Sequence, residues 1–318
     1  MSRADPRIHI MKQGRKSIMK KMMLITMLCL SLGLLGTFSA GANEVILANA
    51  PDYYWWYGCS PTSAGMMMGY YDINGYKGLR YDNLVPGGTA ELDTFTGSPG
   101  WGALANNVIA SKGHVNDFYV GGYGVSGDDR IPPPPYHNFN SLADFMGTSQ
   151  DSVGHSNGLT AFYHWPDSAK YTAQDALNEG VSNKDGMYGM LEYLKYAGYD
   201  ATQIYTQLTD NKVSGGFSFA NYMAEIDAGR VVMIQVEGHS MFGYGYDYPT
   251  QTVYLHDTWS LGEKSMTWGG SYPSPYGDLA MWGVVVMEPT VVPEPATMFL
   301  LGSCMLALAG FRRWFKRQ

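Results

Sequence analysis

The sequence predicts an α+β fold, with a helical N-terminal half and a C-terminal half built on an antiparallel sheet. Ser60 and Pro61 form a helix start, and the apolar and small residues after them predict a helix from Pro61 to about Asp72. The continuous apolar run 231–236 is typical of a central strand, and shorter strand patterns follow it. These observations place the helices before the sheet along the chain.

Residues 1–42 are predicted to be a secretory signal peptide. A basic segment precedes the apolar run 22–35, and the small residues Ala40, Gly41 and Ala42 offer a cleavage site before Asn43. An uncleaved anchor is the weaker interpretation, because this apolar run is too short to span a bilayer.

Residues 291–318 carry a second targeting pattern. The letters VPEPAT precede an apolar run over 296–311, and a basic tail ends the chain. This order resembles the PEP-CTERM sorting signal of Gram-negative bacteria. The resemblance implies an exosortase-type sorting enzyme as partner, a transient inner-membrane anchor with a short transmembrane helix, and a periplasmic, outer-surface or extracellular location after C-terminal processing. It also suggests an exopolysaccharide matrix as a further partner.

The segment 43–290 is acidic. It contains 26 Asp and Glu against 10 Lys and Arg, and the difference of 26 and 10 leaves about 16 negative charges. Such a balance argues against nucleic acid and anionic membrane surfaces as partners.

Cys59 is the only cysteine of this segment, because Cys29 and Cys304 lie in the two terminal signals. Exported proteins normally pair their thiols, so a single thiol is either a nucleophile or a small buried apolar group. The predicted helix start places Cys59 at the positive end of a helix, which lowers a thiol pKa.

Residues 73–180 form a long elaboration with few regular elements, and the strongest patterns return after it. The turn at Asp128 and Asp129 lacks the ligand spacing of a calcium loop. Four scattered histidines also lack metal-ligand spacing, so they are interpreted as surface or packing residues, and neither a metal nor a cofactor is predicted: His114, His137, His155 and His164. Beyond the helix at 61–72, helices are predicted at 100–112, 141–147, 182–197 and 218–228, and strands at 44–47, 231–236 and 252–255, with a last strand pair at 265–268 and 282–287.

Two residues could complete a catalytic group with Cys59. His239 follows the strand 231–236 and Asp257 follows the strand 252–255. Because neighbouring strands lie only about 5 Å apart, the two side chains can meet. His239 alone could be a core histidine, and His256 is expected to point to the opposite face of its strand.

The segments GCSPTSAGMMMGYYD, GHSMFGYGYD and YLHDTW resemble the C-thirty-nine-like group of papain-like cysteine peptidases, which is related to bacteriocin-leader-processing peptidases. The resemblance implies a papain-like fold with Cys on the helical half and His and Asp on the sheet half. It implies that Cys59 is the nucleophile, that His239 is the general base and acid, and that Asp257 orients the imidazole. The expected function is an exported cysteine peptidase-like hydrolase that cleaves a peptide or protein substrate through an acyl-enzyme.

The sequence departs from this family before the nucleophile. Papain-like enzymes usually have a Gln about six residues upstream as an oxyanion donor, but this chain has Tyr53 there. The Cys59 backbone N–H is then expected to act with Asn49, Trp55 or Trp56.

Two other functions stay open at this point. A weak or inactive domain of the same fold could be an extracellular or matrix-associated binding protein that uses the aromatic run 53–57 to stack on sugars or apolar groups. The same chemistry could also act on a cell-wall amide or a transpeptidation acceptor.

Overall fold

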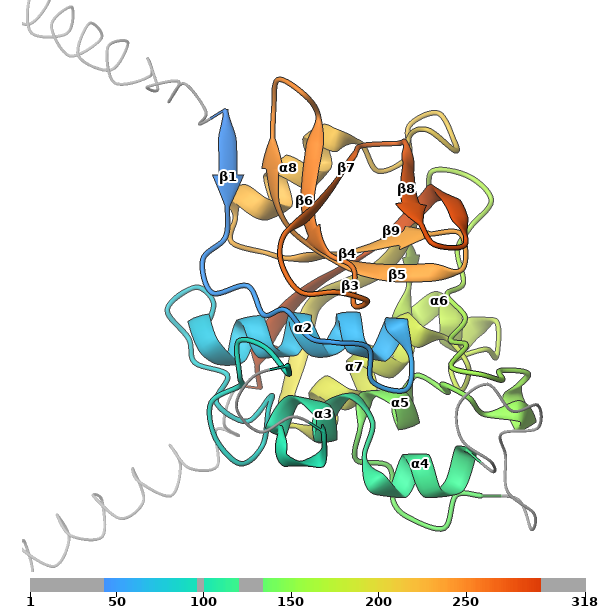
Figure 1. Cartoon of the computed structure of the whole chain (residues 1–318). Helices are drawn as coiled ribbons and strands as arrows, with labels where there is room; N and C mark the ends of the chain where they lie inside the picture. The colour runs from blue at the N-terminus through green and yellow to red at the C-terminus, as the bar shows by residue number, and fades with distance from the viewer. Residues whose placement is uncertain (1–42, 96–99, 120–133, 293–318) are drawn as a thin grey trace, which may run out of the picture. The chain divides into compact units, whose positions relative to one another are not determined.

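The computed structural model describes residues 43–95, 100–119 and 134–292 (Figure 1). The predicted signal peptide, the turn at Asp128 and Asp129 and the apolar run 296–311 lie outside these residues. The described part combines helices with an antiparallel sheet, which confirms the predicted α+β class. None of its helices combines the length and apolarity that crossing a bilayer requires.

The helices follow one another in two groups, one before and one after residue 170. They are α2 (Cys59–Asn74), α3 (Leu104–Ile109), α4 (Lys112–Phe118), α5 (Leu142–Phe145), α6 (Ala173–Asn178), α7 (Gly186–Tyr196) and α8 (Phe219–Asp227), with 3-10 turns at Gly100–Gly102 and Asp151–Val153. The strands are β1 (Glu44–Ile46), β2 (Tyr171–Thr172), β3 (Tyr199–Leu208), β4 (Val232–Val236), β5 (His239–Asp247), β6 (Thr252–His256), β7 (Lys264–Thr267), β8 (Ser271–Ser274) and β9 (Gly277–Val291).

One antiparallel sheet runs in the order β2-β3-β9-β4-β5-β6-β7, with β1 paired to β5 and β8 paired to β9. The predicted central strand is β4, which lies between β9 and β5. Its residues alternate between two cores: Met233 packs in the core shared with α2 and α7, whereas Val232 and Ile234 pack in the core shared with α8. The apolar run is continuous because both faces of this strand are covered.

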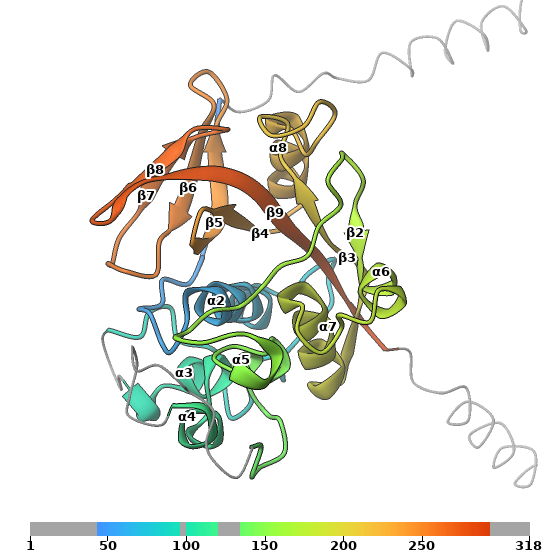
Figure 2. The ribbon, with the colours of Figure 1, turned by 90° about the vertical axis from the view of Figure 1, so that its right-hand side faces the viewer.

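Figure 2 shows α2, α3, α5 and α7 on one side of the sheet and α8 on the other. Helix α2 packs on β5, and α7 packs on β3. A glycine lets α2 approach its neighbour closely, because a Cβ at Gly69 would lie 2.4 Å from the Tyr53 hydroxyl. The start of α2 is fixed against the start of β5 by two contacts to Ser240: the Ser60 hydroxyl lies 2.9 Å from the Ser240 hydroxyl, and the Ser63 hydroxyl donates to the Ser240 carbonyl at 2.9 Å.

The strands and their pairing differ from the prediction made from the sequence, in which β2, β3, β5 and β8 are missing. Strand β3 includes the polar residues Thr206 and Gln207, which are nevertheless buried, and its backbone pairs with β2 on one edge and with β9 on the other. The predicted pairing of 265–268 with 282–287 is also wrong: β7 pairs with β6, and β9 lies between β3 and β4. Local patterns do not encode such distant strand partners.

Helix boundaries differ in smaller ways. The helix predicted at 100–112 is split into a 3-10 turn and α3, because Ala103 is extended. Helix α7 begins at Gly186 with Asp185 as its cap, and not at Ser182. Helix α5 is short, and Ser141 caps it within the predicted range.

Candidate active site

Cys59 is the first residue of α2, and its side chain is partly exposed. Gly58, and not the predicted Ser60, is the N-cap residue. Its φ of 152° is rare for residues with side chains, and a Cβ there would lie 2.8 Å from Pro61. No side chain caps the helix, so the thiol lies at an uncapped, positive helix end.

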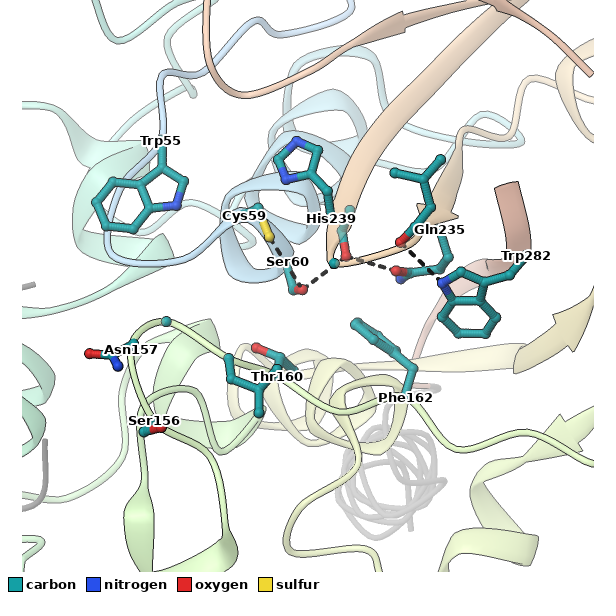
Figure 3. A pocket seen from close by; sticks show the side chains of 15 residues that line it. Trp55, Cys59, Ser60, Ser156, Asn157, Thr160, Phe162, Gln235, His239 and Trp282 are labelled. Carbon is teal, nitrogen blue, oxygen red and sulfur yellow. Dashed lines mark hydrogen bonds between the residues drawn. The ribbon is translucent and has the colours of Figure 1, made fainter. Parts of the chain in front are cut away.

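His239 is the first residue of β5, directly after the β4–β5 hairpin, where it pairs with Val236. Its Nε2 lies 2.7 Å from the backbone carbonyl oxygen of Asp257. A carbonyl can only accept, so Nε2 carries the hydrogen and Nδ1 is the nitrogen that can take a proton. The imidazole lies beside the Cys59 sulfur (Figure 3).

The pKa values of the two groups shift in opposite directions. Burial acts to raise the pKa of the Cys59 thiol, but the hydrogen bond from His239 and its charge outweigh burial and lower that pKa. Burial acts to lower the pKa of His239, but the hydrogen bonds to Cys59 and to the Asp257 carbonyl raise it. These directions favour a thiolate–imidazolium pair.

The carboxylate of Asp257 serves the loop that follows β6. Its Oδ1 accepts from the backbone N–H groups of Trp259 (2.9 Å) and Ser260 (3.0 Å), and its Oδ2 accepts from the Tyr272 hydroxyl (2.7 Å). Asp257 was expected to orient the imidazole, but the group that contacts His239 is its backbone carbonyl. The carboxylate therefore positions the loop that presents this carbonyl.

Trp259 covers the imidazole. Its ring stacks on His239 with a centroid distance of 3.7 Å and an interplanar angle of 14°. An aromatic face stabilises a cationic ring and keeps water from the hydrogen bond at Nε2. In the sequence, Trp259 is only the last letter of a motif, and the strand-end position after Asp257 was its sole signal.

The three expected oxyanion donors lie in different places. Trp55 lines the pocket that contains Cys59. The indole N–H of Trp56 already donates to a backbone carbonyl that follows α3, at 3.1 Å. Asn49 donates to Asn74 at the far end of α2, roughly 22 Å from Cys59 at about 1.5 Å per residue. Asn49 therefore lies away from the thiol, and the indole N–H of Trp56 already has an acceptor.

A glutamine does reach the pocket, but from β4. Gln235 Oε1 accepts from the Ser240 hydroxyl at 2.8 Å, and that hydroxyl lies 2.9 Å from the hydroxyl of Ser60. Ser60 in turn lies next to Cys59, with 4.0 Å between oxygen and sulfur. Papain-like enzymes have their glutamine upstream of the nucleophile, so that pattern does not point to Gln235. The only feature of the sequence that could have identified Gln235 as a site residue is its polar side chain inside the apolar run 231–236.

A pocket of about 430 Å³ surrounds these groups. One wall is the start of α2 with Trp55, and a second is formed by β4, the start of β5 and Trp282 of β9. The third wall is the segment 156–162, except Ala161, which belongs to the long elaboration between α2 and α7. Residues from three distant parts of the chain thus meet at the thiol.

His256, the competing histidine, does not line this pocket. Its ring stacks against Phe242 and Tyr244, and its Nδ1 lies 3.4 Å from Asp52. Burial is the main cause that lowers the pKa of His256 to about 4. It is therefore a neutral core histidine at neutral pH.

Two of the scattered histidines lie in one ion-pair cluster. His114 Nδ1 lies 2.8 Å from Asp144, and His137 contacts both Asp144 and Asp117. His114 is fully buried, so it is a packing residue as predicted. The hydrogen bond to Asp144 is the main cause that raises the pKa of His137 to about 9.

This cluster should make stability depend on pH. The folded pKa of His137 lies above its unfolded value of about 6.5, so its contribution is complete below pH 6.5 and is lost as the pH rises through about 9. The melting temperature of the wild type should therefore fall more between pH 6 and pH 9.5 than that of His137→Gln. His164→Gln, at an exposed histidine, is the matched control; parallel curves for the wild type and His137→Gln would contradict the assignment.

Comparisons with known proteins identify the C-terminal segment. Residues 291–313 match the model of the PEP-CTERM protein-sorting motif, which confirms the sorting signal predicted from the sequence. The motif implies export, membrane-associated sorting and recognition by an exosortase-type enzyme. No curated protein matches the chain.

Proposed function

We propose that the protein is an exported cysteine peptidase-like hydrolase with a papain-like fold, which cleaves a peptide amide through Cys59, His239 and Asp257. The supporting observation is the position of the thiol at the uncapped start of α2, beside an imidazole that the Asp257 carbonyl holds at Nε2. The opposite pKa shifts of Cys59 and His239 agree with this role.

The proposed reaction begins with proton transfer from the Cys59 thiol to Nδ1 of His239. The thiolate then attacks the carbonyl carbon of the amide, and a tetrahedral oxyanion forms. His239 returns the proton to the amine as the C–N bond breaks, which leaves a thioester on Cys59. Water, deprotonated by His239, releases the acid and restores the thiol.

The first donor for the oxyanion is the backbone N–H of Cys59, because an uncapped helix start favours negative charge. Trp55 is the one expected side-chain donor that lines the pocket. Asp257 acts through its carbonyl, which keeps the hydrogen on Nε2 and leaves Nδ1 as the base. Trp259 stabilises the imidazolium that forms between the two proton transfers.

The binding-protein alternative relied on the aromatic run 53–57 as an exposed surface. Tyr53 is fully buried, and only Tyr54 has about half of its surface exposed, at 48%. Trp56 and Tyr57 instead pack against Trp101, at ring distances of 4.8 and 6.0 Å. The run is therefore not one continuous aromatic face, which favours the hydrolase.

The function can be tested on peptide mixtures without knowledge of the substrate. The wild type and Cys59→Ala are incubated with a proteome-derived peptide library, and new termini are identified by mass spectrometry. New termini that require Cys59 support hydrolysis, and products joined to an added amine would indicate transpeptidation. Equal termini with both proteins, together with an unreactive thiol, would refute the proposal.

The predicted signal peptide and the sorting motif together predict the two ends of the mature protein. In a host with an exosortase-type enzyme, the exported protein should begin near Asn43 and should lack residues after about Pro293. Mass spectrometry of both termini checks this, and a host without the sorting enzyme is the control. Exported protein that still carries residues 296–318 in the competent host would be inconsistent with processing.

A further inference from the structure

The pocket beside Cys59 is lined by neutral groups. The residues that form it in the described part of the chain include no Asp, Glu, Lys or Arg, so Cys59 and His239 are its only groups able to carry charge near neutral pH. Apolar and aromatic side chains supply much of its wall: Trp55, Leu159, Phe162, Val236 and Trp282. This neutrality contrasts with the net charge of about −16 that the 26 acidic and 10 basic residues give the segment 43–290.

We propose that this pocket selects substrates with an uncharged, apolar or aromatic side chain next to the scissile amide. The inference rests on the proposed function, because it names the substrate class of the same site. A charged side chain would lose water in the pocket without gaining an opposite charge, which is costly. An apolar side chain would instead add buried area against the aromatic walls.

Figure 3 shows Phe162 and Trp282 at one end of the pocket and Trp55 at the other, with Cys59 and His239 between them. We assign the end formed by Phe162 and Trp282 as the side-chain subsite. In Figure 3 both aromatic side chains lie to one side of Cys59, so a substrate side chain bound between them leaves the thiol free for the carbonyl carbon.

The walls of this subsite are held in place before any substrate binds. The Trp282 indole N–H donates to the Val236 carbonyl at 3.1 Å, and its ring lies 5.3 Å from that of His164. Phe162 lies against Gly186 so closely that a Cβ on this glycine would be 2.8 Å from the phenyl ring. A preformed apolar site loses little entropy on binding, so selectivity should appear in affinity as well as in rate.

Leu159 differs from the other wall residues because half of its surface is exposed, at 50%. A polar or charged side chain at position 159 can therefore reach solvent without disturbing the core. Substitution there can change the charge of the pocket while the protein remains folded.

Binding to Cys59→Ala tests the inference independently of turnover. The probes are peptides Ac-Ala-Ala-X-Ala-Ala-amide with X as Leu, Phe, Gln, Lys or Glu, and tryptophan fluorescence gives each Kd at about 0.15 M salt, where charges are screened beyond about 8 Å. Leu and Phe peptides should bind at least about tenfold more tightly than Lys and Glu peptides. The acidic surface of the protein would favour binding of the cationic Lys peptide. Weak binding of this peptide would therefore be caused by the pocket and not by the surface charge.

A charge introduced at position 159 provides the second arm. In the Cys59→Ala background, Leu159→Glu should reduce the ratio of the Kd of the Lys peptide to the Kd of the Leu peptide by about tenfold. The matched neutral change Leu159→Gln should leave this ratio unchanged. Circular dichroism verifies that both variants are folded. Equal Kd values across the series, tighter binding of a charged peptide, or no binding of any peptide would overturn the inference.

The two proposals fail in different ways. If neutral peptides bind selectively to Cys59→Ala but the wild type cleaves none of them, the pocket assignment stands and the proposed hydrolysis fails. If the wild type cleaves Lys or Glu peptides as rapidly as Leu and Phe peptides through Cys59, hydrolysis stands and the selectivity is refuted.

Discussion

Iodoacetamide should alkylate wild-type Cys59 rapidly at pH 6.5, and His239→Ala should reduce that rate by about 100-fold. The thiolate is the reactive form, and an ordinary thiol with a pKa near 8.5 is only about 1% ionised at this pH. In the wild type the imidazole lowers the pKa of Cys59, so the rate should begin to fall only at lower pH. The pKa of His239 is itself raised, so the imidazole stays protonated to a higher pH than an ordinary histidine and continues to stabilise the thiolate.

The measurement is the alkylation rate from pH 4 to pH 10 for the wild type, His239→Ala and His256→Asn. His256 is the matched control because it is adjacent in sequence to Asp257 but lies outside the pocket. We expect His256→Asn to follow the wild type. A wild-type profile with its midpoint near pH 8.5 and no dependence on His239 would remove the basis for catalysis.

Asp257→Ala should lower kcat/KM by about 100-fold or more, whereas Asp257→Asn should lower it by about tenfold or less. Alanine leaves the N–H groups of Trp259 and Ser260 and the Tyr272 hydroxyl without their acceptor, and a loop shift of about 1 Å misplaces the carbonyl that holds His239. Because these donors would then lack a partner, the free energy of unfolding should also fall by about 2–4 kcal/mol. Asparagine still offers a side-chain oxygen to the loop.

This pair of variants distinguishes two roles for Asp257. If its carboxylate contacted the imidazole during catalysis, asparagine would favour the wrong tautomer and cost about 10⁴ in rate, as in serine proteases. Because the carbonyl makes the contact, we expect the tautomer to survive. Tyr272→Phe, which removes one of the three hydrogen bonds to the carboxylate, should have a smaller effect than Asp257→Ala; equally large losses for asparagine and alanine would favour the carboxylate role.

Much of the local structure was predictable from the sequence. The apolar run 231–236 identified the central strand because both of its faces are buried. The pattern of Ser60 and Pro61 identified a helix start, but the helix begins two residues earlier than predicted, at Cys59, with Gly58 in place of Ser60 as its N-cap. The VPEPAT segment identified the sorting signal, which a comparison confirmed.

The sequence by itself determined the residue types of the site, the class of fold and the targeting of the chain. Only the tertiary structure decided which atoms meet: the Asp257 carbonyl in place of its carboxylate, Trp259 over His239, and Gln235 in the pocket. Helix starts and buried strands depend on neighbours in sequence, so residue patterns record them. Contacts between β4, β5 and the loop after β6 depend on strand register and on loop hydrogen bonds, and no local pattern specifies these.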